Sequence, residues 1–459
     1  MLTVVAIAIF VVAKNTSEWA MAPGELFLAD APHQASDRTA DTYHLFGIPM
    51  DFQVYYRAGE CVLEQGSGCD VYGQNFVTEN NGQRWDLPFT YPPLAAWGFA
   101  QLARVPMLAA AELWQIASLL ALGVLIAACL RERRVHLSLA HLPFIAAVSV
   151  AAFVFVPVRG GFFWGQINLL IAALVAIEFL SIPALRAGDP TRPRSSREPE
   201  SEPEPWWGGI AVGLAAGIKL VPAFFGLLFL LQRRFRAAAV SAVTFLVSIV
   251  AGSVLVPGSF GKWWATIFDV ERFGGVENPT SQSLRLWLAR EAGIDGGPLW
   301  FLLALATTAL ALTSAYFLLK AGRITAALSI VGIGMCLVSP FSWHHYWLWI
   351  VPLAVTGVAD LICWVSNDSS AFARSSLTRS PVTQFAVGAL APLAAVALLW
   401  PFVSVVLGFP FDIWGQINSG NVVGRSAWIL WSLAILAAPT AIHLVASRRS
   451  CTPSERVPE

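Results

Sequence analysis

The chain has 459 residues, of which 56% are hydrophobic and only 13% are charged. A soluble domain carries about 25% charged residues, so this composition, with a mean hydropathy of +0.62, excludes a soluble globular protein and indicates an integral membrane protein. The formal net charge is zero, which leaves no bulk electrostatic basis for binding nucleic acid.

Apolar runs long enough to cross the hydrocarbon core recur along most of the chain. They predict an all-α polytopic bundle of about 12 transmembrane helices within one membrane domain, residues 1–446. The first run is interpreted as an anchor because no basic region precedes it, with a cleaved signal peptide as the alternative. The expected spans are 1–14, 108–130, 138–156, 162–180, 206–219, 220–232, 237–256, 298–319, 323–339, 345–365, 383–406 and 426–446.

Basic residues fall mostly in alternate connections between these spans, which the positive-inside rule assigns to the cytoplasm. The remaining connections, which include 15–91, 257–297, 407–425 and the turn at His344-His345, are then extracytoplasmic. The basic residues are Arg131, Arg133, Arg134, Arg233, Arg234, Arg236, Lys320, Arg323, Arg374, Arg379, Arg448 and Arg449.

The first outer loop is polar, acidic and aromatic, and it is too long to be a simple connector. Cys61 and Cys69 lie in this loop, where a disulfide in an oxidising compartment and two free thiols are equally compatible with the sequence. Residues 91–104 are too short to span a membrane and predict a re-entrant or interface-lying helix entered through Pro92-Pro93.

Two polar segments interrupt or end the apolar pattern. Residues 187–205 mix Pro, Ser, Arg and Glu and predict a disordered cytoplasmic linker, because such a segment cannot bury a core. Residues 447–459 predict a cytoplasmic polar tail. Residues 206–232 are apolar but broken at Lys219, and they predict two short helices that reach the outer half of the membrane and return.

The candidate catalytic residue is Asp51, which begins a short amphipathic segment in the first loop. If that segment is helical, Asp51 and Tyr55 share a face at i, i+4 spacing. One interpretation makes Asp51 a general base that removes the proton of an acceptor hydroxyl. The other makes it an N-cap on a surface helix, and the local motif does not decide between them.

Further polar side chains gather at the predicted outer ends of the spans, where cations and hydrogen-bond donors would suit a phosphate ligand. Lys219 at its helix break is a natural phosphate contact, although a lysine that extends to the interface is the alternative. Adjacent helical side chains point about 100° apart, so His344 and His345 are not expected to share a metal; one of them is expected to contact phosphate while the other packs. The candidate substrate-binding residues are Tyr55, Tyr91, Arg159, Gln166, Asn168, Lys219, Gln282, His344 and His345.

Five short motifs occur in one order along the chain: Asp51-Phe52-x-Val54-Tyr55, Phe89-Thr90-Tyr91-Pro92-Pro93, Gly165-Gln166-x-Asn168, Gly217-Ile218-Lys219-x-x-Pro222 and Ser339-Pro340-x-Ser342-Trp343-x-His345. This ordered set resembles glycosyltransferase family 87 and extends from about residue 1 to 446. Ser281-Gln282-Ser283 stands where the family often has Asn-Gln-Ser, so the resemblance implies no role for residue 281.

The resemblance implies a GT-C-type bundle with a large first extracytoplasmic loop, in the plasma membrane of an actinobacterium. It implies transfer of mannose from a polyprenyl-phosphate donor to a glycolipid acceptor such as a phosphatidylinositol mannoside, lipomannan or lipoarabinomannan. Asp51 is then similar to the catalytic base, and Lys219 with His344 or His345 to donor-phosphate contacts. No metal or other cofactor is expected, because protein cations can stabilise the departing phosphate.

Two other functions remain open. The first is transfer of arabinofuranose from a polyprenyl phosphate, a reaction of some similar proteins. The second is a transporter or lipid flippase, which would typically show repeated halves and a site at mid-membrane depth. The polar residues here gather on one side, and Trp-Gly-Gln-Ile-Asn at 164–168 and 414–418 is the only repeat and is interpreted as chance, so an enzyme is favoured.

Overall fold

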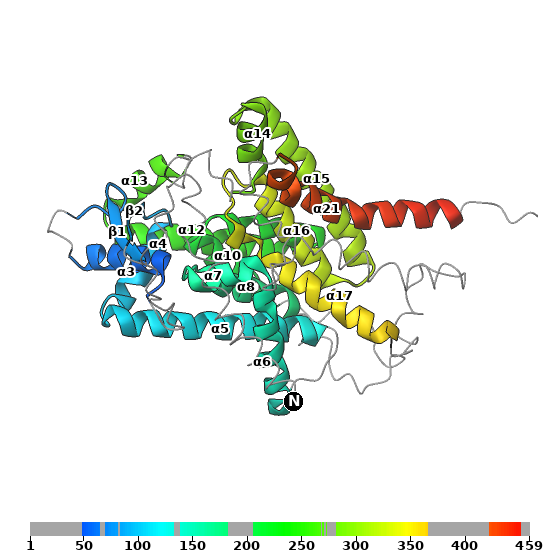
Figure 1. The fold of residues 1–459 in the computed structure, drawn as a ribbon, viewed down its shortest axis with the longest axis horizontal. Coiled ribbons are helices and arrows are strands. Elements are labelled where there is room, and N and C mark those ends of the chain that lie inside the picture. Colours follow the sequence, from blue (N-terminus) through cyan, green and yellow to red (C-terminus); the bar gives the residue numbers. More distant parts are fainter. Residues whose placement is uncertain are drawn as a thin grey trace, which may run out of the picture.

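The fold is that of a computed structural model (Figure 1). It describes residues 48–64, 69–80, 83–132, 138–181, 205–267, 269, 272, 281–365 and 422–450. The expected spans 1–14 and 383–406, the linker 187–205, the second Trp-Gly-Gln-Ile-Asn copy and the tail beyond residue 450 lie outside the described residues.

Apolar helices dominate the described part of the chain, as in a membrane protein. Three helices are long and apolar enough to cross a membrane: α5 (Met107–Glu132), α12 (Phe235–Leu255) and α15 (Gly297–Lys320). They match three expected spans closely, because an uninterrupted apolar run of this length forms a helix that must be buried in lipid or protein. With one bent helix pair the count rises to four among the described residues, so the expected total of about 12 is not confirmed.

The bent pair corrects the span expected at 162–180. Helix α7 (Val156–Phe163) ends before the Trp164–Ile167 turn, and the chain resumes as α8 (Asn168–Ala176) and the π-helical turn η3 (Ile177–Ser181). The two helices meet at 118°. Gly165 adopts φ +72°, a backbone conformation that breaks a right-handed helix, so the apolar run is not continuous.

Several other expected spans consist of shorter pieces. The span expected at 138–156 comprises η1 (Leu139–His141), α6 (Leu142–Ala151) and η2 (Ala152–Val154). Two short helical segments also occur on either side of Lys219, as expected. The remaining elements are α10 (Ile210–Ile218), η5 (Val221–Phe225), α11 (Gly226–Leu231), α14 (Leu284–Ala292), α16 (Ile324–Val338), η7 (His344–Trp349), α17 (Ile350–Val365) and α21 (Val422–Ser450).

The first described segment of the chain folds against one end of the other helices, at the left of Figure 1. It contains α3 (Met50–Leu63), an antiparallel hairpin of β1 (Asn75–Asn80) and β2 (Gln83–Pro88), and the short helix α4 (Pro93–Leu102). Helix α13 (Ser259–Thr266) packs beside α4 and the end of α12. The sequence analysis missed the hairpin, although Asn81-Gly82 between two short runs is a known hairpin signal.

Two covalent and steric features fix this part of the fold. Cys61 and Cys69 form a disulfide, which resolves the alternative that the sequence left open. Gly59 lies so close to α4 that a Cβ there would come within 2.4 Å of the Phe99 carbonyl oxygen. Helices α3 and α4 can therefore pack backbone to backbone near Gly59.

A buried ion pair ties η3, which follows α8, to the start of α12. Glu178 is fully buried and accepts hydrogen bonds from Arg234 Nη2 and the Gly209 main-chain N–H, both at 2.9 Å. The guanidinium of Arg234 also lies 4.8 Å from the centre of the Phe229 ring. We expect Glu178→Ala to lower the free energy of unfolding by about 3 kcal/mol, because it leaves a largely buried guanidinium without its carboxylate.

Thermal unfolding of the detergent-solubilised protein measures this loss. Asp295→Ala is the control, because it removes an exposed ion pair with Arg285 and is expected to cost less than about 1 kcal/mol. Equal unfolding temperatures for the two variants would contradict a stabilising role of the ion pair between Glu178 and Arg234.

Candidate active site

Asp51 lies in the first turn of α3, whose N-cap is Pro49. Asp51 is therefore not the N-cap, and the surface-capping interpretation of this residue is wrong. Its main-chain N–H donates to the Trp164 carbonyl at 3.0 Å, and its side chain accepts a hydrogen bond at Oδ2 from Gln166 Nε2. The carboxylate is thus directed toward the turn between α7 and α8 rather than toward the end of its own helix.

Gly165 allows this turn to approach α3 closely. A Cβ at this position would lie 2.7 Å from Pro49 Cβ and 2.9 Å from Phe52 Cβ, so a larger residue would push the two elements apart. The Gly165 carbonyl also accepts a hydrogen bond from Trp114 Nε1 in α5 at 2.8 Å. Three elements distant in sequence therefore fix the position of the adjacent Gln166.

Three more side chains extend the hydrogen-bond network from Gln166. Tyr91 OH donates to Gln166 Oε1 at 3.1 Å, and Tyr55 OH lies 2.7 Å from Tyr91 OH. Tyr72 OH holds the main chain there by donating to the Tyr91 carbonyl at 2.8 Å. Sequence analysis missed Tyr72, whose position in a polar loop gives no signal of a buried contact.

Lys219 lies at the break between α10 and η5, with 7% of its surface exposed. Its Nζ donates to Asn168 Oδ1 at 2.8 Å and lies 3.7 Å from the centre of the Tyr346 ring and 5.3 Å from that of Tyr91. The short distance to the Tyr91 ring connects the lysine with the network of Asp51. Lys219 therefore faces protein groups instead of extending to the membrane surface.

The two histidines lie in the 3₁₀-helix η7 beside the same residues. Asn168 Nδ2 donates to the His345 carbonyl at 3.1 Å, and the His344 and His345 rings are 5.0 Å apart at 75°. Both are buried. Gly160 in α7 makes room for His344, because a Cβ on this glycine would lie 2.3 Å from His344 Nε2.

The remaining candidates line the neighbourhood of this turn. Gln282 is fully buried, and its main-chain N–H donates to the Ser342 carbonyl at 2.8 Å. Ser281 forms a β-bridge with Trp343, so the segment before α14 is attached to the turn that carries both histidines. Arg159 is 1% exposed within α7, next to Gly160. Gln282 is thus bonded to the segment just before His344, and Arg159 adjoins the glycine that faces His344.

The charge of Asp51 depends on two opposing effects. Burial raises the pKa of this carboxyl from 3.8 to about 7, although the hydrogen bond from Gln166 and the positive charge of Lys219 both lower it. Perturbed carboxyl groups of this kind are typical of general bases. Near neutral pH, Asp51 can therefore gain or lose a proton.

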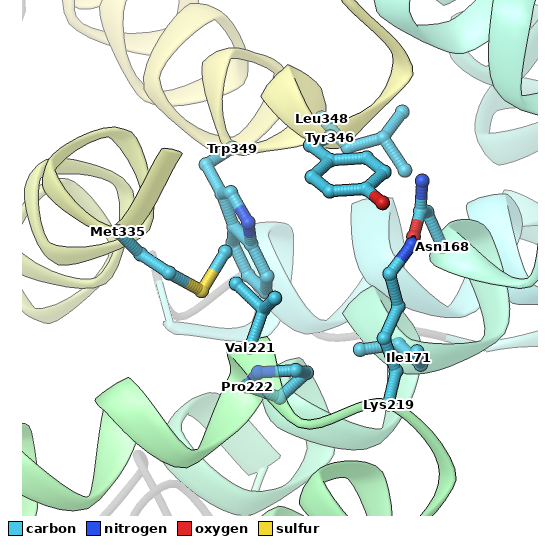
Figure 2. A pocket seen from close by; sticks show the side chains of 9 residues that line it. All are labelled: Asn168, Ile171, Lys219, Val221, Pro222, Met335, Tyr346, Leu348 and Trp349. Carbon is cyan, nitrogen blue, oxygen red and sulfur yellow. Dashed lines mark hydrogen bonds between the residues drawn. The ribbon is translucent and has the colours of Figure 1, made fainter. Parts of the chain in front are cut away.

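A small, partly open cavity lies beside Lys219 (Figure 2). Asn168, Lys219 and the Tyr346 hydroxyl lie at one side of it, while Met335 and Trp349 lie at the other. A cation and an amide next to apolar walls suit a group that joins an anion to a hydrocarbon. Sequence analysis did not identify Tyr346, although it directly follows the two histidines.

The described residues contain no group of three His, Cys, Asp or Glu side chains close enough to hold a metal ion. The site instead combines one carboxylate, one lysine, amides and tyrosines between helices of a membrane protein. A buried carboxylate with a lysine and an apolar cavity nearby has the groups that transfer to a hydroxyl requires.

Comparison with known proteins identifies that class. The family model for glycosyltransferase family 87 matches residues 89–340, more than half of the chain. This membrane protein belongs to glycosyltransferase family 87. The resemblance stated from the five sequence motifs is therefore confirmed. No solved structure matches the fold.

Curated relatives occur in mycobacteria. The chain is 30% identical over 425 residues, 88% of this chain and 85% of the relative, to the polyprenol-phosphate-mannose-dependent alpha-(1-2)-phosphatidylinositol mannoside mannosyltransferase of Mycolicibacterium smegmatis. It is 32% identical, over 67% of this chain, to the corresponding phosphatidylinositol pentamannoside mannosyltransferase of Mycobacterium tuberculosis. That second match spans 65% of the relative's own length.

Proposed function

We propose that the protein transfers mannose from a polyprenyl-phosphate donor to a phosphatidylinositol mannoside-type glycolipid and forms an α-linkage. The family and the names of its relatives support the donor and the acceptor class. The observation that carries the proposal for this chain is the hydrogen-bonded path from Asp51 through Gln166 and Tyr91 to the ring that faces Lys219. A base and a cation are thereby joined in one site.

The proposed reaction is a single displacement at the anomeric carbon. The acceptor oxygen forms a bond to that carbon, the bond to the phosphate oxygen breaks, and the phosphate leaves with the electron pair. Asp51 accepts the proton of the acceptor hydroxyl as attack proceeds. A β-linked donor then gives an α-linked product, because the attacking and leaving oxygens occupy opposite faces of the sugar.

The proposed phosphate position is at Lys219, whose charge would stabilise the leaving group. The apolar walls of the cavity in Figure 2, formed by Val221, Pro222, Met335 and Trp349, would then hold the first part of the prenyl chain. His345 lies across Asn168 from Lys219 and is the histidine that we propose as a second phosphate contact. Arg159, Gln282 and His344 are proposed to border the same site.

Transfer of arabinofuranose is the competing activity. Purified protein in lipid nanodiscs, given a phosphatidylinositol mannoside acceptor and either polyprenyl-phosphate mannose or polyprenyl-phosphate arabinose, separates the two. We expect a mannosylated product from the first donor and none from the second. Product formation from the arabinose donor alone would overturn the proposal.

We further propose a GT-C-type bundle over residues 1–446 in the plasma membrane, with a large first extracytoplasmic loop and the active site on the outer side. The disulfide between Cys61, in the last turn of the helix whose first turn contains Asp51, and Cys69 supports this side because disulfides persist in oxidising compartments. The basic residues at the opposite ends of the spans agree with it. The segments 187–205 and 447–459 are proposed to be cytoplasmic.

Two exposed residues, Asp295 just before α15 and Lys320 at its last position, offer a test of this orientation. We expect Asp295→Cys to react with a membrane-impermeant maleimide on intact cells, and Lys320→Cys to react only after the membrane is opened. The wild-type protein supplies the background from the native cysteines. The reverse pattern would place the active site in the cytoplasm.

The pH dependence of transfer reports the ionisation of Asp51. The base acts as the carboxylate, so kcat/KM is expected to rise as the pH increases through about 7, where this carboxyl titrates. An ordinary aspartate would already be ionised at pH 5. Initial rates between pH 5 and 9 at low donor concentration measure this, and a rate unchanged down to pH 5 would contradict the role.

A further inference from the structure

The hydrogen bonds around Asp51 have a direction that its charge imposes. An ionised carboxylate only accepts hydrogen bonds, so the NH₂ group of Gln166 must face Asp51 and its Oε1 must face Tyr91. Tyr91 then uses its one proton on Gln166 Oε1 at 3.1 Å. The remaining contact, 2.7 Å between the two tyrosine hydroxyls, requires Tyr55 to donate to Tyr91.

The opposite direction leaves one proton without an acceptor. A proton on Oδ2 of Asp51 would be donated to a flipped Gln166, whose NH₂ group would then donate to Tyr91, and Tyr91 would donate to Tyr55. The proton of Tyr55 would then need another acceptor. Within the described part of the chain the recorded hydrogen-bond partner of the Tyr55 hydroxyl is Tyr91. Tyr55 is 2% exposed, and its ring stacks on Phe99 with centres 4.6 Å apart.

A buried hydroxyl that donates to nothing is unfavourable, because it loses its bond to water without replacement. The network therefore disfavours a proton on Oδ2. A proton on Oδ1 leaves the directions unchanged, but Gln166 then donates to a neutral oxygen and its hydrogen bond is weaker than the one to a carboxylate. This asymmetry acts against burial, which favours the neutral carboxyl.

We propose that Gln166 and Tyr91 are positioning residues that hold Asp51 ionised and fix Oδ2, so that the other carboxylate oxygen receives the proton of the acceptor. The inference rests on the proposed function for the role of the base. The sequence predicted direct substrate contact for Tyr91 and Gln166; under this inference they act through Asp51 instead. Tyr55 ends the network and sets its direction.

Four ionisable side chains influence Asp51. Lys219 favours the ionised form through its positive charge. Tyr55, Tyr91 and Tyr346 are close enough to interact with the carboxylate; Tyr55 and Tyr91 are buried and Tyr346 is half-buried. Burial and the nearby carboxylate both raise the pKa of Tyr55 and Tyr91, so these phenols remain neutral hydrogen-bond donors across the pH range of activity.

Infrared titration of the protein in nanodiscs tests the network without any substrate. The C=O stretch of the protonated Asp51 carboxyl is assigned by its absence in Asp51→Asn. We expect its midpoint near pH 7 in the wild type, and about one pKa unit higher in Gln166→Met and in Tyr91→Phe, because each loses part of a hydrogen bond that favours the charged form. Tyr91→Phe keeps the ring beside Lys219.

Tyr72→Phe is the matched control. It removes a buried hydroxyl that contacts the Tyr91 carbonyl but lies outside the directed network, so the midpoint should stay at the wild-type value. A midpoint that is unchanged or lower in both Gln166→Met and Tyr91→Phe would overturn the inference. So would an equal rise in Tyr72→Phe, because that would indicate a general disturbance of the loop.

Kinetics provides the second measurement. A positioning role predicts that kcat falls in Gln166→Met while the KM values for donor and acceptor change less than about threefold. It also predicts that the acidic side of the pH–rate profile moves to higher pH by the same shift as the infrared midpoint. A raised KM with an unmoved acidic side of the profile would overturn the inference in favour of direct substrate contact. If no mannose is transferred by the wild type, the proposed function fails, whereas the infrared titration still decides the network.

Discussion

Asp51→Asn is expected to reduce mannose transfer by at least about 10²–10⁴-fold, the usual contribution of a general base. The amide cannot accept the acceptor's proton, but it has nearly the same shape as the carboxylate. The oxygen of the new amide can accept the hydrogen bond from Gln166 Nε2 in place of Oδ2, so the fold around the first turn of α3 should persist. Initial rates of product formation from polyprenyl-phosphate mannose measure the loss.

Donor affinity separates a lost base from a lost binding site in that variant. We expect the dissociation constant for polyprenyl-phosphate mannose to stay within about threefold of the wild type, because the phosphate is proposed to bind at Lys219. Asp70→Asn is the control, since Asp70 lies in the same loop and bonds the exposed Lys262. Near wild-type turnover by Asp51→Asn would remove this residue from the mechanism.

Lys219→Met is expected to have the second largest effect, a fall in kcat/KM of about 10²–10³-fold. Methionine has a similar length and fits an apolar cavity, but it offers no charge to a departing phosphate. It also leaves Asn168 Oδ1 without its 2.8 Å partner. Rates measured over a range of donor concentrations should show both a higher KM for the donor and a lower kcat.

Lys262→Met is the control that shows whether removing another lysine lowers kcat/KM as Lys219→Met does. Lys262 is 56% exposed and pairs with Asp70 at 2.7 Å on α13, so its removal should change transfer less than about threefold. A Lys219→Met enzyme with unchanged donor KM and unchanged kcat would mean that the phosphate binds elsewhere.

Hydropathy predicted the parts of the fold that water and lipid alone determine. Helices α5, α12 and α15 agree with their expected spans because each is a single uninterrupted apolar run. The turn at Gly165 was missed, because one glycine in an apolar run is compatible with a helix until a neighbouring backbone, here Pro49 and Phe52, occupies the space of its side chain. Such tertiary contacts leave no periodic signal in the sequence.

The candidate site could be predicted as a set of residues but not as an arrangement. Charged side chains near the ends of apolar runs are costly to bury, which marked Asp51 and Lys219 as candidates. The structure brings the two residues into one network around Tyr91. The sequence could not decide whether Gln166 faces a ligand or a protein side chain, since an amide suits both. Its partners, Asp51 and Tyr91, come from distant segments and become visible only in the fold.

A cryo-electron microscopy structure of Asp51→Asn with polyprenyl-phosphate mannose bound in nanodiscs examines the joint placement of base and cation. We expect the phosphate within hydrogen-bond distance of Lys219 Nζ, the prenyl chain leaving past Pro222 and Trp349, and the anomeric carbon on the side of residue 51. A donor phosphate remote from Lys219, or a sugar with its anomeric carbon turned away from residue 51, would contradict the account.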